Sequence, residues 1–338
     1  MLLVVNFGLL DSSDERIQLR EVTHTTGFFY LVGHGVPTEL VSELHAVAHE
    51  FFALPDENKL AIELARSPHF RGYSRVGGEL TNGEVDWREQ IDFGPEADAA
   101  GGAAGPQWLR GPNQWPPAIP AMPELVGRYQ QEMNRVAREL LRRWAQSLGS
   151  PSEIFDSAFG AEPASLMKLI HYPQRPANAS DDQGVGAHKD PGVMTLLHLP
   201  QESTGLQVQS LDGAWLDVPP LDGAFIVNIG ELLEVSSQGY LRATPHRVVT
   251  PAGAPARISI PYFFGPALDG VVPTLRLPLD LAAKTRPISH DANNQLHSTY
   301  GENMWKAKRR AHPDVFARWH AGEPEPSRLP VSPRCAPG

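Results

Sequence analysis

Cysteine is almost absent from this chain, because Cys335 is the single example among 338 residues. One cysteine cannot form a disulfide within the chain, which excludes a disulfide-stapled secreted fold and favours a reducing, cytoplasmic compartment. A run of about 20 apolar residues, as a transmembrane helix needs, is also lacking. The amino-terminal MLLVVNFGLL has no basic start and runs into the acidic DSSDE. We therefore expect a buried strand over Leu2 to Phe7, and neither a signal peptide nor a membrane anchor.

Positive charge is scarce as well. Lys and Arg total 29 against 39 Asp and Glu, which gives a net charge of −10. Such a balance repels nucleic acid and anionic membranes, so neither is expected as a partner. The two basic runs, Arg142-Arg143 and Lys306 to Arg310, lie in helix-like sequence and are interpreted as solvated faces. With 41% hydrophobic residues the chain can bury a large core, and it carries no signal for an oligomeric state.

Helix and strand patterns alternate in the first third of the chain. The aromatic and β-branched run Thr26 to Val32 predicts a strand. Pro37-Thr38 opens a predicted helix, and Asp56 to Ala65 predicts a second, shorter one. The small residues of Ala97 to Pro106 are typical of a mobile surface linker. The longest predicted helix, Pro123 to Leu148, carries an apolar stripe at helical spacing.

Beyond this helix the chain consists of short apolar runs separated by Gly and Pro. Repeated strands at such spacing predict a barrel or jelly roll. A final helix is predicted over about Gly301 to His320, before a Pro-rich tail that is typical of disorder. The predicted strands are Leu166 to Tyr172, Gly192 to Leu199, Gly205 to Gln209, Trp215 to Val218, Phe225 to Ile229, Arg247 to Thr250 and Arg257 to Phe264.

Two histidines and one aspartate form the first chemical signal. His188 and Asp190 are two residues apart, so on one strand both side chains would point to the same face. Pro191 favours extended backbone at Asp190. His246 can arrive from another strand and complete a set of two imidazoles and one carboxylate. This set suits iron(II) with three open coordination positions, as oxygen activation requires.

A second pair of side chains points to an acidic cosubstrate. Arg257 and Ser259 follow the same two-residue spacing and should project into the barrel. A guanidinium can bind a carboxylate through two parallel hydrogen bonds, and a neighbouring hydroxyl can add another. Tyr172 could supply a further hydroxyl, or its phenol could simply satisfy a hydrogen bond in the core. The sequence therefore predicts a seat for a dicarboxylate.

Other histidines have simpler interpretations. His312 and Asp314 repeat the same spacing, but Pro313 and Asp314 resemble the first turn of a helix, so this second pair is assigned to helix capping. His34, His171 and His198 are interpreted as core or surface residues rather than ligands.

The sequence resembles the isopenicillin N synthase-like branch of the 2-oxoglutarate and iron(II)-dependent dioxygenases. The resemblance implies an α+β fold with a mainly β core, a double-stranded β-helix (jelly roll) flanked by helices. It assigns the iron ligands to His188, Asp190 and His246, and the 2-oxoglutarate-binding residues to Arg257, Ser259 and Tyr172. The matching stretches, in chain order, are GFFYLVGHGV, RGYSRVGGE, LIHYP, GAHKDPGVMTLL, GLQV, FIVNIGELLEVSSQGYLRATPHRVV and RISIPYFFGP.

The resemblance also implies a domain plan and a reaction. The plan has an N-terminal dioxygenase region at 1–115, a long support helix at 116–160, the Fe(II)/2-oxoglutarate double-stranded β-helix domain at 161–268, and a C-terminal helical extension with a flexible tail at 269–338. The reaction is that of an oxidoreductase, typical of secondary metabolism, which uses iron(II), 2-oxoglutarate and O2. It would oxidise, most often hydroxylate, a small-molecule metabolite and release succinate and CO2. No catalytic side chain beyond the metal centre is expected, and candidates for the substrate pocket are Phe70, Arg71, Tyr73 and Phe263.

Three alternatives use the same residues. In an iron(II) oxidase of the isopenicillin N synthase type, which does not use 2-oxoglutarate, Arg257, Ser259 and Tyr172 would hold a substrate carboxylate. A barrel could bind a ligand without turnover. A zinc hydrolase could use the three metal ligands, but it would leave the Arg257 and Ser259 pair without a role. The sequence does not distinguish an amino acid, a peptide, a terpenoid or an aromatic product as the substrate.

Overall fold

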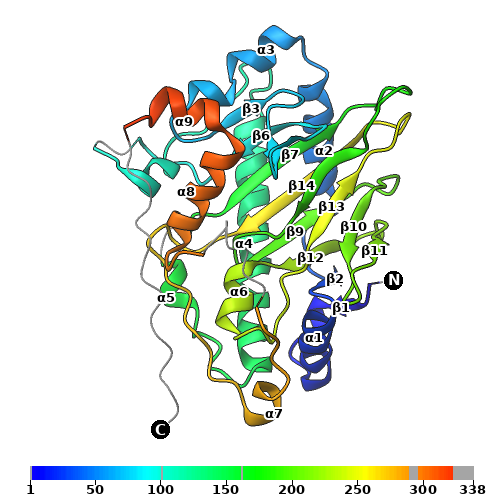
Figure 1. Cartoon of the computed structure of the whole chain (residues 1–338), viewed down its shortest axis with the longest axis vertical. Coiled ribbons are helices and arrows are strands. Elements are labelled where there is room, and N and C mark those ends of the chain that lie inside the picture. The colour runs from blue at the N-terminus through cyan, green and yellow to red at the C-terminus, as the bar shows by residue number, and fades with distance from the viewer. Residues whose placement is uncertain (1, 100–101, 161–162, 289–295, 323–338) are drawn as a thin grey trace.

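The computed structural model describes residues 2–99, 102–160, 163–288 and 296–322, and its centre is a pair of β-sheets (Figure 1). Strands in both sheets pair antiparallel, apart from the parallel pair β1 and β2. The larger sheet has the order β1 (Val4–Asn6), β2 (Phe28–Val32), β12 (Phe225–Ile229), β9 (Met194–His198), β14 (Arg257–Phe264), β7 (Leu166–Tyr172), β6 (Glu89–Phe93) and β3 (Gly72–Ser74). The smaller sheet has the order β11 (Trp215–Asp217), β10 (Leu206–Gln209), β13 (His246–Val249) and β8 (Gln183–His188).

Helices cover the outer face of the larger sheet. The longest, α4 (Met122–Ser147), runs behind the strands in Figure 1, and its buried stripe includes Met133, Val136 and Trp144. This stripe belongs to one apolar cluster with Ile258 and Ile260 of β14. An amphipathic helix is stabilised in this way, by packing its apolar face on a sheet. The other helices are α1 (Ser13–Thr25), α2 (Thr38–Phe52), α3 (Asp56–Ala61), α5 (Asp156–Phe159), α6 (Glu231–Ser236), α7 (Leu279–Ala282), α8 (Tyr300–Ala311) and α9 (Pro313–Trp319).

The inner faces of the two sheets enclose a second, smaller core. One apolar cluster joins Phe28 and Ile226 of the larger sheet to Leu206 of the smaller sheet. Another cluster contains Ile170 and Tyr172 of β7 with Val185 and Val248 of the smaller sheet. Strand alternation directs these side chains inward, while their neighbours in sequence face the helices. The expected jelly roll flanked by helices is therefore confirmed.

Several predicted elements end earlier than expected. The strand expected over Leu2 to Phe7 is β1, and Val4 in it is 41% exposed, so the predicted burial of this strand holds only in part. The short helix predicted over Asp56 to Ala65 ends at Ala61, and a 3-10 turn over Leu64–Arg66 follows it. The single helix expected over Gly301 to His320 is two helices, α8 and α9, which meet at His312. Pro313 has no N–H and disfavours helical backbone at the preceding residue, which breaks the helix there.

One basic run differs from its interpretation as a solvated face. Lys308 in α8 is only 5% exposed, and its ammonium contacts the carboxylate of Asp92 on β6. An ammonium buried to this extent needs such a partner. Among the helices that the structure describes, none has the length and apolar character that crossing a bilayer requires.

Some expectations concern residues outside the described ranges, namely part of the linker at 100–101 and the tail from 323, which contains Cys335. The division at residues 115, 160 and 268 stays a prediction. Strands β2 and β6, from the first of these regions, hydrogen-bond directly to strands β12 and β7 of the third.

Candidate metal centre and cosubstrate site

The two histidines of the predicted metal centre lie opposite each other on neighbouring strands. His188 is the last residue of β8 and His246 is the first residue of β13, and the two are register partners. Asp190 does not share the strand, contrary to the prediction, because β8 ends at His188 and Asp190 lies in the turn that follows. The backbone of this turn is held by Glu231, whose N–H donates to the Asp190 carbonyl at 2.8 Å.

The three side chains converge on one point. Oδ1 of Asp190 lies 3.7 Å from Nε2 of His188 and 3.7 Å from Nε2 of His246. The two imidazole rings are 4.3 Å apart between centroids. One ligand atom from each residue lies within 4.8 Å of the other two. These separations suit three donors around a single cation.

Hydrogen bonds fix which ring nitrogen of each histidine can bind a metal. Nδ1 of His188 lies 2.9 Å from the carbonyl oxygen of Gly186, and Nδ1 of His246 lies 3.1 Å from that of Thr244. A carbonyl oxygen only accepts, so each Nδ1 carries the proton and each Nε2 presents a lone pair. Burial, together with the nearby His246, lowers the pKa of His188 to about 4, so this ring is neutral at physiological pH.

Asp190 is oriented through its other oxygen. Oδ2 accepts hydrogen bonds from the hydroxyl of Thr195 on β9 and from Nδ2 of Asn228 on β12, the latter at 2.7 Å. Burial by itself raises the pKa of Asp190, but His246, His188 and these hydrogen bonds outweigh it and bring the pKa below its ordinary value. The carboxylate is therefore ionised, with Oδ1 free to bind a cation.

Sequence reasoning missed Thr195 and Asn228. Each is a polar residue inside an otherwise apolar strand, in MTLL and in FIVNI. In a buried strand such a residue must find a polar partner, so this interruption was an available signal.

The donor set fits iron(II). Imidazole nitrogens and a carboxylate oxygen are ligands that iron(II) accepts, and a set of three protein ligands leaves further coordination positions for other groups. The outer contacts of all three side chains match those that orient metal ligands in proteins, namely carbonyls on the histidines and hydrogen-bond donors on the carboxylate.

The predicted cosubstrate residues lie on the inner face of the larger sheet. Arg257 and Tyr172 are register partners on β14 and β7, and Ser259 pairs with Ile170 in the same way. The guanidinium of Arg257 lies over the Tyr172 ring, 4.0 Å from its centroid. Its Nη2 is buried and has no hydrogen-bond partner in the protein. A buried donor of this kind needs an acceptor, and a carboxylate fits it.

The candidate substrate residues are dispersed. Phe263 is the register partner of Thr195, which places it beside the residue that holds Asp190. Phe70 packs edge-on against Trp305 at 5.7 Å, in an apolar cluster at α8 and α9. Arg71 donates to the Leu109 carbonyl, and the Tyr73 hydroxyl donates to Glu89. Their role in substrate binding stays a prediction.

Two cavities lie outside the metal centre formed by His188, Asp190 and His246. The larger, of about 1190 Å³, is lined by Arg71, Gln130 and Tyr262 among others, and so borders the outer face of the larger sheet. The smaller, of about 200 Å³, includes Lys189 and Glu234 in its lining, next to the metal-binding turn. None of these three candidate metal ligands lines either cavity.

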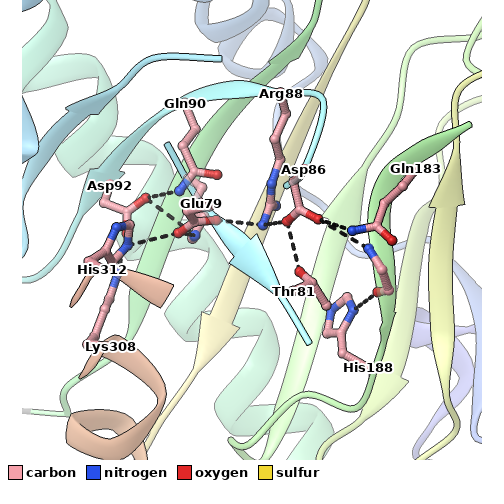
Figure 2. Close-up of polar contacts among 12 residues, drawn as sticks. Glu79, Thr81, Asp86, Arg88, Gln90, Asp92, Gln183, His188, Lys308 and His312 are labelled. Carbon is pink, nitrogen blue, oxygen red and sulfur yellow. Dashed lines mark hydrogen bonds and ion pairs between the residues drawn. The ribbon is translucent and has the colours of Figure 1, made fainter. Parts of the chain in front are cut away.

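A second group of potential ligands, Glu79, Asp92 and His312, is buried near α8. His312 occupies the first position before α9, but its side chain caps nothing. Its Nε2 instead lies 2.9 Å from Oε1 of Glu79, so the interpretation as a capping motif was wrong for this side chain. Lys168 and Arg88 neutralise Glu79, and Figure 2 shows how these contacts continue toward β8. Lysine and arginine side chains already pair with both carboxylates of this group, so we interpret it as a salt-bridge network. We call it the charged cluster, formed by Glu79, Asp86, Arg88, Asp92, Lys168, Lys308 and His312.

Two carboxylates of the charged cluster, Glu79 and Asp92, should make the fold sensitive to acid, whereas burial raises the pKa of Asp86. Burial by itself raises the pKa values of Glu79 and Asp92, but Lys168 with Arg88, and Lys168 with Lys308, outweigh it and hold both pKa values below their ordinary range. A carboxylate with a depressed pKa stabilises the fold at pH values above its unfolded pKa of about 4, and this stabilisation is lost as the pH falls through the folded pKa. Urea unfolding at a series of pH values from 7 to 3 should therefore show a steep loss of stability below about pH 4.

The matched variant is Lys308→Met, which leaves Asp92 with one cation fewer. Breaking a buried ion pair costs about 3 to 5 kcal/mol, so the variant should be less stable at pH 7. Its acid-induced loss should also be shallower, because the pKa of Asp92 is then less depressed. Identical pH slopes in the two proteins would contradict this account.

Two family descriptions match the chain. Residues 4–118 match the N-terminal region of non-haem dioxygenases in morphine synthesis, and residues 163–266 match the 2OG-Fe(II) oxygenase superfamily.

Individual proteins match over most of their length. The 2-oxoglutarate-dependent dioxygenase frbJ of Dothideomycetidae sp. (strain 11243) is 34% identical over 320 residues, which cover 89% of this chain and 86% of that protein. A homoarginine-6-hydroxylase of Arabidopsis thaliana is 34% identical over 293 residues, covering 85% and 86%. The crystal structure of JOX2 with 2OG, Fe and JA superposes with a TM-score of 0.68 at 27% identity, over 81% of this chain and 78% of that one.

Proposed function

The chain belongs to the 2OG-Fe(II) oxygenase superfamily, and we propose that its iron(II) is held by His188, Asp190 and His246. The observation that carries this assignment is the convergence of two Nε2 lone pairs and one carboxylate oxygen within 4.8 Å of one another. The outer hydrogen bonds support it, because each Nδ1–H donates to a backbone carbonyl, which directs Nε2 toward the metal, and Oδ1 of Asp190 stays available.

The cosubstrate site follows from the same face of the larger sheet. Arg257 binds the carboxylate of 2-oxoglutarate that is remote from the metal, through a nitrogen that has no partner in the protein. Ser259, which is 3% exposed, donates a further hydrogen bond. The guanidinium lies over the Tyr172 ring, 4.0 Å from its centroid, and this contact restricts the positions that the fork can take.

The enzyme is an iron(II)- and 2-oxoglutarate-dependent dioxygenase. When bound, iron(II) and 2-oxoglutarate together supply the activation of O2 that oxidises a C–H bond of the substrate and yields succinate and CO2. The protein's contribution is to orient the ligands through Gly186, Thr244, Thr195 and Asn228, and to exclude water with the apolar cluster around Val185 and Val248.

The substrate is a small molecule. Relatives that support this class include the homoarginine-6-hydroxylases and JOX2, which was crystallised with the small ligand JA. The first compounds to test are therefore basic amino acids, homoarginine among them, followed by small aromatic and aliphatic acids.

The test measures succinate and O2 together. With iron(II), 2-oxoglutarate and a candidate substrate, one succinate should form per O2 consumed, and removal of either iron or 2-oxoglutarate should stop both. O2 consumption that needs substrate but no 2-oxoglutarate would instead support the iron(II) oxidase alternative, in which Arg257 holds a substrate carboxylate. Iron binding without any O2 consumption across the panel would favour the ligand-binding barrel.

A further inference from the structure

The strand that ends at His188 is the outermost strand of its sheet. The smaller sheet has the order β11-β10-β13-β8, so β8 pairs with a strand on one side only. Even that pairing is irregular, because the register with β13 shifts between His246 and Val248 and again at Val249. An outer strand with an irregular ladder leaves backbone groups without strand partners, and here it carries a metal ligand at its end.

Asp86 accepts hydrogen bonds from this strand. Its side chain is fully buried and its Oδ1 accepts two hydrogen bonds from β8. One comes from the backbone N–H of Gly186 at 3.3 Å, and the other from Nε2 of Gln183 at 3.1 Å. Since Nδ1 of His188 donates to the carbonyl of Gly186, Asp86 holds the residue that orients the metal-binding imidazole.

Asp86 ends a two-stranded hairpin that lies along β8. The hairpin consists of β4 (Leu80–Thr81) and β5 (Glu84–Val85). At its turn, Nδ2 of Asn82 donates to the carbonyl of Ala187 at 2.8 Å, one residue before His188. The two segments pack closely, because a Cβ added to Gly186 would lie 2.8 Å from Cγ2 of Thr81. Polar contacts thus reach β8 at its start, its middle and its end.

The hairpin is itself anchored in the core at its other end. Nη2 of Arg88 bridges Oδ2 of Asp86 at 3.0 Å and Oε2 of Glu79 at 2.5 Å. Glu79 in turn accepts a hydrogen bond from Nζ of Lys168 on β7, at 2.8 Å. Figure 2 shows this row of side chains, which runs from His188 through Asp86 and Glu79 to the helical residues beyond. Glu79 and Asp86, which flank the hairpin, are buried and ion-paired, so the hairpin is anchored at its base.

We propose that residues 79–86 form a clamp that positions the His188 end of β8, with Asp86 as the positioning residue. The clamp makes no contribution to the ligand set. It fixes Gly186 and Ala187, and through them the direction of the His188 ring, so iron(II) affinity depends on a carboxylate outside the metal centre. This inference rests on the metal centre proposed above.

The test compares two equally buried carboxylates of the charged cluster. Asp86→Ala should weaken Co(II) binding to the metal-free protein, measured by anaerobic titration, by about tenfold. Asp92→Ala is the matched control, because Asp92 is also fully buried and ion-paired but contacts Lys168 and Lys308 instead of β8. It should lower the melting temperature to a similar degree and leave Co(II) affinity unchanged. Asp86→Asn, which keeps one acceptor oxygen for Gly186, should recover most of the affinity.

A milder variant keeps the test valid if Asp86→Ala does not fold. Asn82 adopts a φ of +55°, which glycine accepts readily, so Asn82→Gly removes the bond to Ala187 at little conformational cost. It should weaken Co(II) binding by about two- to fivefold, less than the ten- to hundredfold typical of an outer contact, because Asn82 bonds to Ala187 and not to the residue that orients the His188 ring.

His188→Ala separates failure of the clamp from failure of the metal centre. If wild-type protein binds Co(II) and His188→Ala does not, the centre stands. Unchanged affinity in Asp86→Ala and Asn82→Gly, or an equal loss in Asp92→Ala, would then overturn the clamp alone. If His188→Ala binds Co(II) as wild type does, the proposed centre fails, and the clamp fails with it.

Discussion

Replacing His246 with alanine should lower iron(II) affinity by more than about a hundredfold and reduce succinate formation to background. Loss of an outer hydrogen bond around a metal typically costs ten- to a hundredfold, and loss of a ligand should cost more. His246 faces both other ligands, and no other His, Cys, Asp or Glu among the described residues joins this group. The measurements are an anaerobic iron(II) titration and a succinate assay on the same preparation.

His198→Ala is the matched control for this substitution. His198 is a half-buried histidine of the larger sheet, and its Nδ1 lies 2.7 Å from Nε2 of His45, so its removal also breaks a histidine contact. Iron(II) affinity should stay at the wild-type value in this variant. Wild-type affinity in His246→Ala, or an equal loss in both variants, would remove the basis for the proposed centre.

The strands that the sequence predicted best are those with apolar residues on both faces. Strands β7, β12 and β14 have the predicted bounds, and nearly all of their residues are buried. They lie inside the larger sheet, between the helices and the smaller sheet, so neither face requires polar residues. A continuous apolar run is then a sufficient signal.

Strand β6 was not predicted, for the opposite reason. Its sequence, EQIDF, reads as surface, yet each of its residues is buried. Glu89 accepts from Lys59 and from Tyr73, and Asp92 pairs with Lys308, more than 200 positions further along the chain. Such distant ion pairs leave no trace in a local pattern, and the same limit explains why Lys308 was interpreted as solvated.

The structure brings His188, Asp190 and His246 together, as the sequence predicted, but the local geometry differs from the prediction. The spacing of His188 and Asp190 was explained by a shared strand, whereas the chain turns after His188 and returns the carboxylate to the imidazoles. Thr195 and Asn228, which hold that carboxylate, come from strands β9 and β12. Which strands become neighbours is a property of topology, and residue spacing alone does not specify it.

Arg257→Met should raise the KM for 2-oxoglutarate by about a hundredfold and change iron(II) affinity in its absence little. Methionine keeps an unbranched apolar stem against Tyr172 but removes the fork that binds the cosubstrate carboxylate. Loss of a buried, charge-assisted contact costs about 3 kcal/mol, which corresponds to a factor of about a hundred in binding. At saturating 2-oxoglutarate much of kcat should return, because the ligand set at the metal is intact. Initial rates of succinate formation against 2-oxoglutarate concentration measure both constants.

Arg247→Met separates this role from a general effect of removing a stacked arginine. Arg247 lies over the ring of Trp215 at 4.3 Å, much as Arg257 lies over Tyr172, but it bonds to Gln207 of the smaller sheet. Its loss should leave the KM for 2-oxoglutarate unchanged. A wild-type KM in Arg257→Met would contradict the cosubstrate assignment. If the KM of the primary substrate rose in its place, the guanidinium would be holding a substrate carboxylate, as an oxidase that needs no 2-oxoglutarate requires.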